Sequence, residues 1–106
     1  MKFFEFKFFE FNDYEYYALI VADGEEKAVL GYEETVGEIF EEEKELSPDV
    51  ITVEEALERY KKGTIEGCET IGEKIRDFYK NINNFKEYVS KGTGQYLVLL
   101  IDGSLI

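Results

Sequence analysis

One stretch of this chain constrains the fold more than any other. Between residues 71 and 89, apolar side chains recur with spacings of 4, 3, 4, 3 and 4, at Ile71, Ile75, Phe78, Ile82, Phe85 and Val89. This period predicts one continuous helix of about 20 residues, roughly 30 Å long. Such a stripe must be covered, either by the chain's own sheet or by a partner helix in a coiled coil. We favour the sheet, because Phe78 and Phe85 are bulky for a dimer seam.

Strands for that sheet are predicted near the N-terminus. Residues 2–11 alternate in part, and three phenylalanines share one face of the predicted strand: Phe4, Phe6 and Phe8. Residues 14–22 are rich in Tyr, Ile and Val, which favour strands. Asn12 and Asp13 lie between the two segments and are typical turn residues, so the pattern predicts a hairpin.

Two further segments add strands to this hairpin. Residues 96–101 are wholly apolar, which predicts a central strand buried on both faces. Val50 and Ile51 follow a break at Pro48 and indicate a short strand. Residues 38–46 are weakly periodic, and either a strand or an irregular segment fits them.

Helix starts are marked by a capping residue followed three positions later by Glu. The pattern occurs at Asp23 with Glu26, at Thr52 with Glu55, and at Thr70 with Glu73. The first predicted helix turns four apolar residues toward the sheet: Ala28, Val29, Tyr32 and Val36. The chain therefore predicts one α+β domain over residues 1–106, in which the hairpin and a C-terminal strand form a small, mainly antiparallel sheet. About three helices pack on this sheet, the longest near residues 70–90.

The charge of the chain narrows its partners. It has 24 Asp+Glu, 12 Lys+Arg and no His, which gives a formal net charge of −12. Nucleic acids and anionic membranes are recognised through cationic surfaces, so we expect neither as a direct partner. An apolar fraction of 44% is too high for a disordered acidic tail. A lone Cys68 and the lack of an apolar run near the ~18 residues of a membrane span predict a soluble, cytoplasmic protein.

Signatures of catalysis and metal binding are weak. Without histidine the chain has no Ser-His or Cys-His nucleophile pair and no His-ligated metal site. The acidic neighbours Glu66 and Glu69 disfavour the thiolate of Cys68. Gly92 and Gly94 precede a predicted strand, whereas a phosphate-binding loop opens a helix. Carboxylate pairs are too numerous to single one out, so we expect a protein that is not an enzyme and has no cofactor.

Acidic residues are concentrated in the first part of the chain. Residues 1–46 hold 14 acids and 4 bases, net −10, whereas residues 47–106 hold 10 acids and 8 bases, net −2. In residues 33–45 one base, Lys44, lies among seven acids: Glu33, Glu34, Glu38, Glu41, Glu42, Glu43 and Glu45. Residues 33–45 span about 20 Å as a helix, over which a DNA duplex carries roughly 12 charges and one strand about half as many. The net −6 of this run is therefore too sparse for a duplex and, if the run is compact, comparable to one strand.

This acidic run has two interpretations. It is either a solvated face that promotes solubility or a surface that binds the basic surface of another protein. Leu30 falls outside the buried stripe of its helix, flanked by Glu33 and Glu34. An apolar residue inside a charged rim is typical of an interface anchor, so Leu30 is a candidate contact residue along with the seven acids.

Two segments resemble small acidic proteins of phages and bacterial mobile elements, YYALIVADGEEKA at residues 16–28 and LLIDGSLI at residues 99–106. That loose class includes anti-CRISPR and anti-restriction inhibitors, which occupy nucleic-acid-binding surfaces. The resemblance implies a non-enzymatic inhibitor of a nucleic-acid-handling complex, whose acidic face mimics phosphates. The alternative is an oligomerising structural or accessory protein, assembled through the 71–89 helix.

Overall fold

The computed structural model describes residues 6–14, 16–43, 46–63, 65, 67–92 and 95–101. The elements, in chain order, are β1 (Lys7–Phe11), β2 (Ala18–Ala22), α1 (Glu25–Thr35), the 3₁₀ helix η1 (Glu41–Glu43), β3 (Asp49–Ile51), α2 (Val53–Lys62), α3 (Ile71–Ser90) and β4 (Tyr96–Ile101). The predicted contact residue Glu45 and the predicted strand residue Phe4 lie outside the described residues. The described positions of the ambiguous segment 38–46 contain η1 and no strand.

The four strands form one antiparallel sheet in the order β3-β1-β2-β4. β1 and β2 pair in the predicted hairpin, where Phe9 lies opposite Ile20. β3 pairs with the other side of β1, and β4 pairs with the other side of β2. The prediction of an α+β fold with a small antiparallel sheet is therefore confirmed, and so is the short strand that contains Val50 and Ile51.

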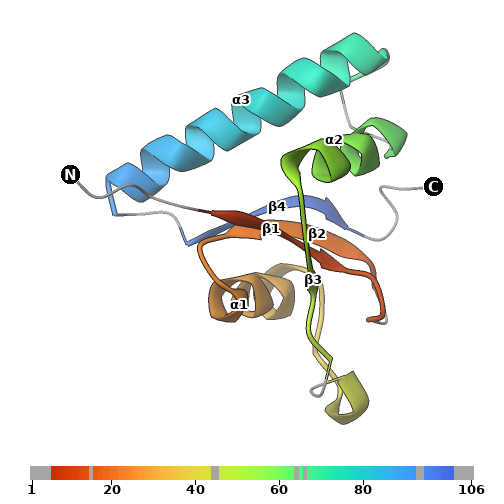
Figure 1. Cartoon of the computed structure of the whole chain (residues 1–106), viewed down its shortest axis with the longest axis vertical. Coiled ribbons are helices and arrows are strands. Elements are labelled where there is room, and N and C mark those ends of the chain that lie inside the picture. Colours follow the sequence, from red (N-terminus) through yellow and green to blue (C-terminus); the bar gives the residue numbers. More distant parts are fainter. Residues whose placement is uncertain are drawn as a thin grey trace.

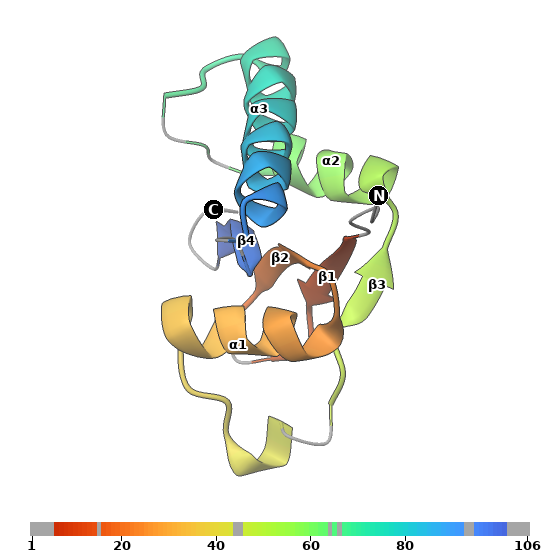
Figure 2. The ribbon, with the colours of Figure 1, turned by 90° about the vertical axis from the view of Figure 1, so that its left-hand side faces the viewer.

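Helices cover both faces of this sheet. Figures 1 and 2 show α1 on one side and α2 with α3 on the other. Because side chains alternate along a strand, β1 and β2 send successive residues to opposite layers. Phe8 and Leu19 pack in the cluster under α2 and α3, whereas Phe9 and Ile20 pack in the cluster under α1. The sheet is thus the middle of three layers, and its two central strands are buried on both faces.

Side-chain caps start the two helices of the second layer. The Thr52 hydroxyl accepts a hydrogen bond from the backbone N–H of Glu55, and the Glu55 carboxylate accepts one from the Thr52 N–H, both at 3.1 Å. This is the predicted capping box at the start of α2. Thr70 accepts from the N–H of Glu73 at 3.1 Å and begins α3 in the same way.

The start of α1 differs from the prediction. Asp23 is not the capping residue, because its carboxylate pairs with Lys27 at 2.9 Å. The residue before the helix is Gly24, which has no side chain that could cap the helix. The buried stripe is nevertheless as predicted, since the side chains that pack against the sheet are Ala28, Val29, Tyr32 and Val36.

The long stripe of α3 is used inside the molecule. Phe78, Ile82 and Phe85 are buried, and the ring of Phe78 stacks on Phe8 of β1 with centroids 6.1 Å apart. Ile71, in the first turn, is 58% exposed. The interpretation of the stripe as a core-facing surface is therefore supported. Neither α3 nor any other helix in the described ranges is long and apolar enough to span a membrane.

β4 lies at an edge of the sheet, so the prediction of a central strand is wrong. Leu19 pairs with Leu100 and Ile20 pairs with Val98, which leaves Leu99 as a bulge. Leu99 and Leu100 both pack toward α2 and α3, while Val98 packs toward the α1 layer. β4 is apolar because helices cover both of its faces. The sequence pattern alone does not distinguish this arrangement from that of a central strand, which pairs with a neighbour at both edges.

Candidate functional site

The outer side of α1 carries an exposed leucine between two glutamates. Leu30 is 37% exposed, which confirms that it lies outside the buried stripe. Glu33 and Glu34 follow one turn later and are also exposed, one on each flank of Leu30. The opposite side of the helix is fixed to the sheet by Ala28 and Tyr32, which are fully buried. The arrangement places an apolar side chain within an acidic rim.

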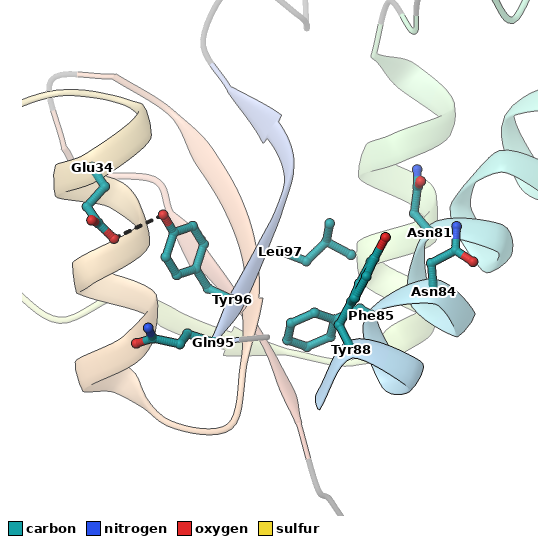
Figure 3. Close-up of a pocket in the computed structure, with 8 residues that line it drawn as sticks. All are labelled: Glu34, Asn81, Asn84, Phe85, Tyr88, Gln95, Tyr96 and Leu97. Atoms are coloured by element: carbon teal, nitrogen blue, oxygen red, sulfur yellow. Dashed lines mark hydrogen bonds between the residues drawn. The ribbon is translucent and has the colours of Figure 1, made fainter. Parts of the chain in front are cut away.

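One of these glutamates is held in place by β4. The Tyr96 hydroxyl donates a hydrogen bond to Oε1 of Glu34 at 3.0 Å (Figure 3). The Tyr96 ring packs on Gly31, where an added Cβ atom would lie only 2.7 Å from Cδ1 of the ring. Burial and the hydrogen bond to Glu34 raise the pKa of Tyr96. The hydroxyl therefore remains a donor at neutral pH, and Glu34 is an oriented carboxylate.

A pocket of about 550 Å³ opens beside this carboxylate. Glu34 lies on the α1 side of the pocket, as Figure 3 shows, and the remaining lining comes from α3 and from the start of β4. Those residues are Asn81, Asn84, Phe85, Tyr88, Gln95, Tyr96 and Leu97. Aromatic rings, amides and one carboxylate suit a side chain with an apolar stem and a cationic end, which is the chemistry of Lys and Arg.

The other predicted contact residues are divided between several places. Glu33 lies on the flank of α1 away from Glu34, at a cavity of about 150 Å³ that Glu25 and Glu43 also line. Glu43 is 8% exposed and accepts a hydrogen bond from the Phe40 N–H at 3.0 Å. Its position is therefore structural, and the expectation that it belongs to an exposed acidic face is wrong.

Three more of the predicted acids are exposed around η1: Glu38, Glu41 and Glu42. Figure 2 shows η1 beyond α1, on the side away from the sheet. Glu45 lies outside the described residues. The structure thus brings Leu30, Glu33 and Glu34 together on one helix and leaves the later acids on a separate segment.

We define the acidic α1 surface as Leu30 with the three exposed glutamates on the same side of α1, which are Glu26, Glu33 and Glu34. The helix has 11 residues and is about 16 Å long, over which a duplex carries roughly 9 charges and a single strand roughly 5. Three carboxylates are closer to the single strand. The surface therefore matches a patch of basic side chains better than it imitates a duplex.

Other chemistry has little support within the described part of the chain. No group of three or more acidic or thiol side chains there is placed to hold a metal ion. Burial, followed by the charges of Asp77 and Glu73, raises the pKa of the Cys68 thiol. A raised pKa leaves this cysteine protonated at neutral pH and a weak nucleophile.

Sequence reasoning missed Tyr96, Gly31 and the α3 wall of the pocket. Tyr96 and Glu34 are 62 residues apart in the chain, and no local pattern links positions at that separation. Asn84 lies off the apolar stripe of α3, where Asn lowers helix propensity, and was not among the predicted contact residues. The available signal was an aromatic residue with a hydroxyl at the start of an otherwise aliphatic strand, since a buried Tyr requires a partner for its hydroxyl.

Comparison with known proteins identifies a family. No curated protein and no solved structure gives a match to the chain. One family model matches residues 6–89, which are 84 of the 106 residues and run from the start of the sheet to the end of α3. The acidic α1 surface lies within the match, and β4 lies beyond it. The chain belongs to the family described as the YosH C-terminal domain.

Proposed function

We propose that this domain is a non-enzymatic binding module whose acidic α1 surface occupies a basic surface on a nucleic-acid-binding protein. Leu30 makes the apolar contact, and Glu33 and Glu34 pair with Lys or Arg around it. The basic residues covered in this way are those that would otherwise hold phosphates. The consequence is inhibition of a nucleic-acid-handling complex, of the anti-CRISPR or anti-restriction type, in the cytoplasm.

The observation that supports this proposal most strongly is the environment of Leu30. An exposed leucine with a charged rim has the layout of an interface anchor, in which polar neighbours shield an apolar contact from water. Glu34 strengthens the case because Tyr96 already fixes its rotamer. A side chain that is ordered before binding loses less conformational entropy when the complex forms.

Electrostatics would act mainly on the rate of association. A surface with three carboxylates in a protein of net charge −12 attracts a basic partner over several ångströms. Such steering raises association rates by roughly 10–10³-fold and weakens as salt shortens the Debye length to about 8 Å at physiological ionic strength. The proposal therefore requires binding that is faster at low salt.

The test is binding of the immobilised protein to a panel of purified nucleic-acid-binding proteins, measured by surface plasmon resonance with and without competing nucleic acid. The double variant Glu33→Gln/Glu34→Gln should weaken binding by about tenfold, because it removes two rim charges. A matched control, Glu54→Gln/Glu87→Gln, removes the same charge from exposed positions on α2 and α3 and should leave binding within about threefold.

Two results would overturn the proposal. Equal losses in the two double variants would show that net charge alone matters, and unchanged binding in both would exclude the acidic α1 surface. Assembly through α3, the alternative function, has no comparable support. Its seam would need Phe78 and Phe85, and both side chains lie in the core.

A further inference from the structure

A buried carboxylate links β1 to α2, at a distance from the acidic α1 surface. Glu10 of β1 is 6% exposed. Its Oε2 atom accepts hydrogen bonds from the Tyr17 hydroxyl and from Nε of Arg59, both at 2.7 Å. Burial, followed by the hydrogen bond to Glu10, raises the pKa of Tyr17, and the bond to Glu10 raises the pKa of Arg59. Both donors therefore keep their protons at neutral pH.

The second oxygen of this carboxylate is open. Within the described residues, Oε1 of Glu10 accepts no hydrogen bond, yet no buried side-chain oxygen there lacks a partner. Oε1 is therefore accessible, and Glu10 lines a pocket of about 380 Å³ together with Asn12, Tyr17, Arg59 and Lys62. Arg59 uses Nε for Glu10 and also interacts with the Tyr17 hydroxyl, and its guanidinium has further N–H groups that can bond an acceptor in the pocket.

The described residues that line this pocket carry a net positive charge, although the protein as a whole is strongly acidic. Arg59 and Lys62 contribute two positive charges and Glu10 contributes one negative charge, so the sum is +1. The carbonyl end of α2, where Lys62 lies, offsets about half a charge. The pocket should therefore attract a small anion, with moderate affinity.

The open oxygen of Glu10 adds a second requirement. A ligand that brings only negatively charged oxygens would meet the carboxylate as a repulsive neighbour. A ligand that also carries a hydrogen-bond donor would pair with Oε1 and satisfy a charged acceptor, a bond that is stronger than one between neutral groups. The site therefore calls for an oxyanion that keeps a proton at neutral pH.

We propose that this pocket binds inorganic phosphate as the hydrogen phosphate ion. This ion has charged oxygens for the terminal nitrogens of Arg59 and the amine of Lys62, and it retains a P–OH group that donates to Oε1 of Glu10. Sulfate has the same tetrahedral shape and no proton at neutral pH, so the pocket discriminates against it. The site is independent of the acidic α1 surface, because the two share no residue.

The test is a pair of NMR titrations of the full chain at neutral pH, with sodium phosphate and with sodium sulfate at matched ionic strength. Phosphate should shift the amide signals of residues around the pocket and saturate at millimolar concentration. Sulfate should bind at least about tenfold more weakly, because it offers no donor to Oε1. A wild-type protein that binds both ions equally, or that shows no saturable shift with phosphate, would overturn the proposal.

Variants separate the roles of the two charges. Glu10→Gln should bring the affinities for phosphate and sulfate within about threefold of each other, since an amide can donate to either ion. Lys62→Gln, at an exposed position that the fold does not need, should weaken phosphate binding about three- to fivefold. Its matched control is Lys61→Gln, because Lys61 pairs with Glu58 at 2.7 Å and does not line the pocket. Equal effects of Lys62→Gln and Lys61→Gln would contradict the site even if Glu10→Gln failed to fold.

Discussion

The two helical layers differ in charge although the same sheet supports both. Residues 23–43, which form α1 and η1, hold nine acids and one base, net −8. Residues 52–92, which contain α2 and α3, hold eight acids and eight bases, net 0. The sheet thus separates a side with a large negative net charge from a side whose positive and negative charges are equal in number. The surface proposed to bind basic partners lies on the acidic side, and the pocket proposed to bind an anion lies on the balanced side.

The layers also differ in how they are held to the sheet. The α1 layer relies on Tyr32, whose hydroxyl donates to the Tyr16 carbonyl at 2.9 Å and accepts from the Tyr16 N–H at 3.2 Å. The second layer relies on Phe78, which contacts Phe8 and Tyr60, and on the pair between Arg59 of α2 and Glu10 of β1. Three pairs of substitutions test the differences between the two layers, from the largest expected effect to the smallest.

Phe78→Ala removes the ring at the centre of the balanced layer. Because this side chain is fully buried, the free energy of unfolding should fall by about 3–5 kcal/mol, measured by urea denaturation. Ile71→Ala lies on the same stripe at an exposed position and should change stability by less than about 0.5 kcal/mol. If Phe78→Ala stayed equally stable and changed the molecular mass in light scattering, the stripe would be an oligomer seam.

Gly31→Ala disturbs the contact between the acidic layer and β4. The new methyl group would lie 2.7 Å from the Tyr96 ring, so the ring must move and its hydrogen bond to Glu34 must break. Overpacking costs about 1–3 kcal/mol, and the better helix propensity of Ala returns up to about 1 kcal/mol. We expect a net loss of stability and a large shift of the Tyr96 ring signals by NMR.

Gly37→Ala is the matched control for this prediction. An added Cβ at residue 37 would lie 3.6 Å from the Tyr16 ring, which is an ordinary contact. Its stability should stay within about 0.5 kcal/mol of the wild type. A Gly31→Ala protein with unchanged Tyr96 signals would show that the close approach at Gly31 does not position the ring.

The third contrast concerns the helix starts. Thr52→Ala removes the hydroxyl that accepts a hydrogen bond from the Glu55 N–H in the α2 capping box and should lower the free energy of unfolding by about 1 kcal/mol. Gly24→Ser places a hydroxyl where α1 has no side-chain cap and where an added Cβ meets no atom within 4 Å. It should raise stability by a few tenths of a kcal/mol. Thermal denaturation measures the stability of both variants. Equal changes in stability would contradict the difference in capping between α1 and α2.

Features determined by neighbouring residues were predictable from the sequence. The spacing of apolar residues located α3 and the buried stripe of α1, and the Thr–Glu pair located the start of α2. The prediction for Asp23 was wrong because its carboxylate has two local partners, the helix N–H groups and Lys27. The sequence does not indicate which of the two it binds. The prediction that β4 is a central strand was wrong because burial under helices and burial between strands produce the same apolar run.

Features that depend on distant pairs were not predictable. Glu10 and Arg59 are 49 residues apart, and they meet only because β3 joins β1 and delivers the chain to α2. Glu43 belongs to a run of exposed acids in the sequence, yet it turns inward to bond the Phe40 N–H. In both cases the outcome depends on where the backbone lies in space, and local periodicity carries no information about that.

The bulge at Leu99 also bears on aggregation. Within the described residues, no further strand pairs with the two outer edges of the sheet, which are β3 over three residues and β4 over six apolar ones. A long, regular apolar edge is a template on which a second copy can add a strand, the first step toward fibrils. Leu99 interrupts the spacing of the backbone groups along β4 and increases the local twist, and β3 is too short to recruit a partner strand. We therefore expect the irregular pairing of β4 to hinder the addition of a second copy at this aliphatic edge.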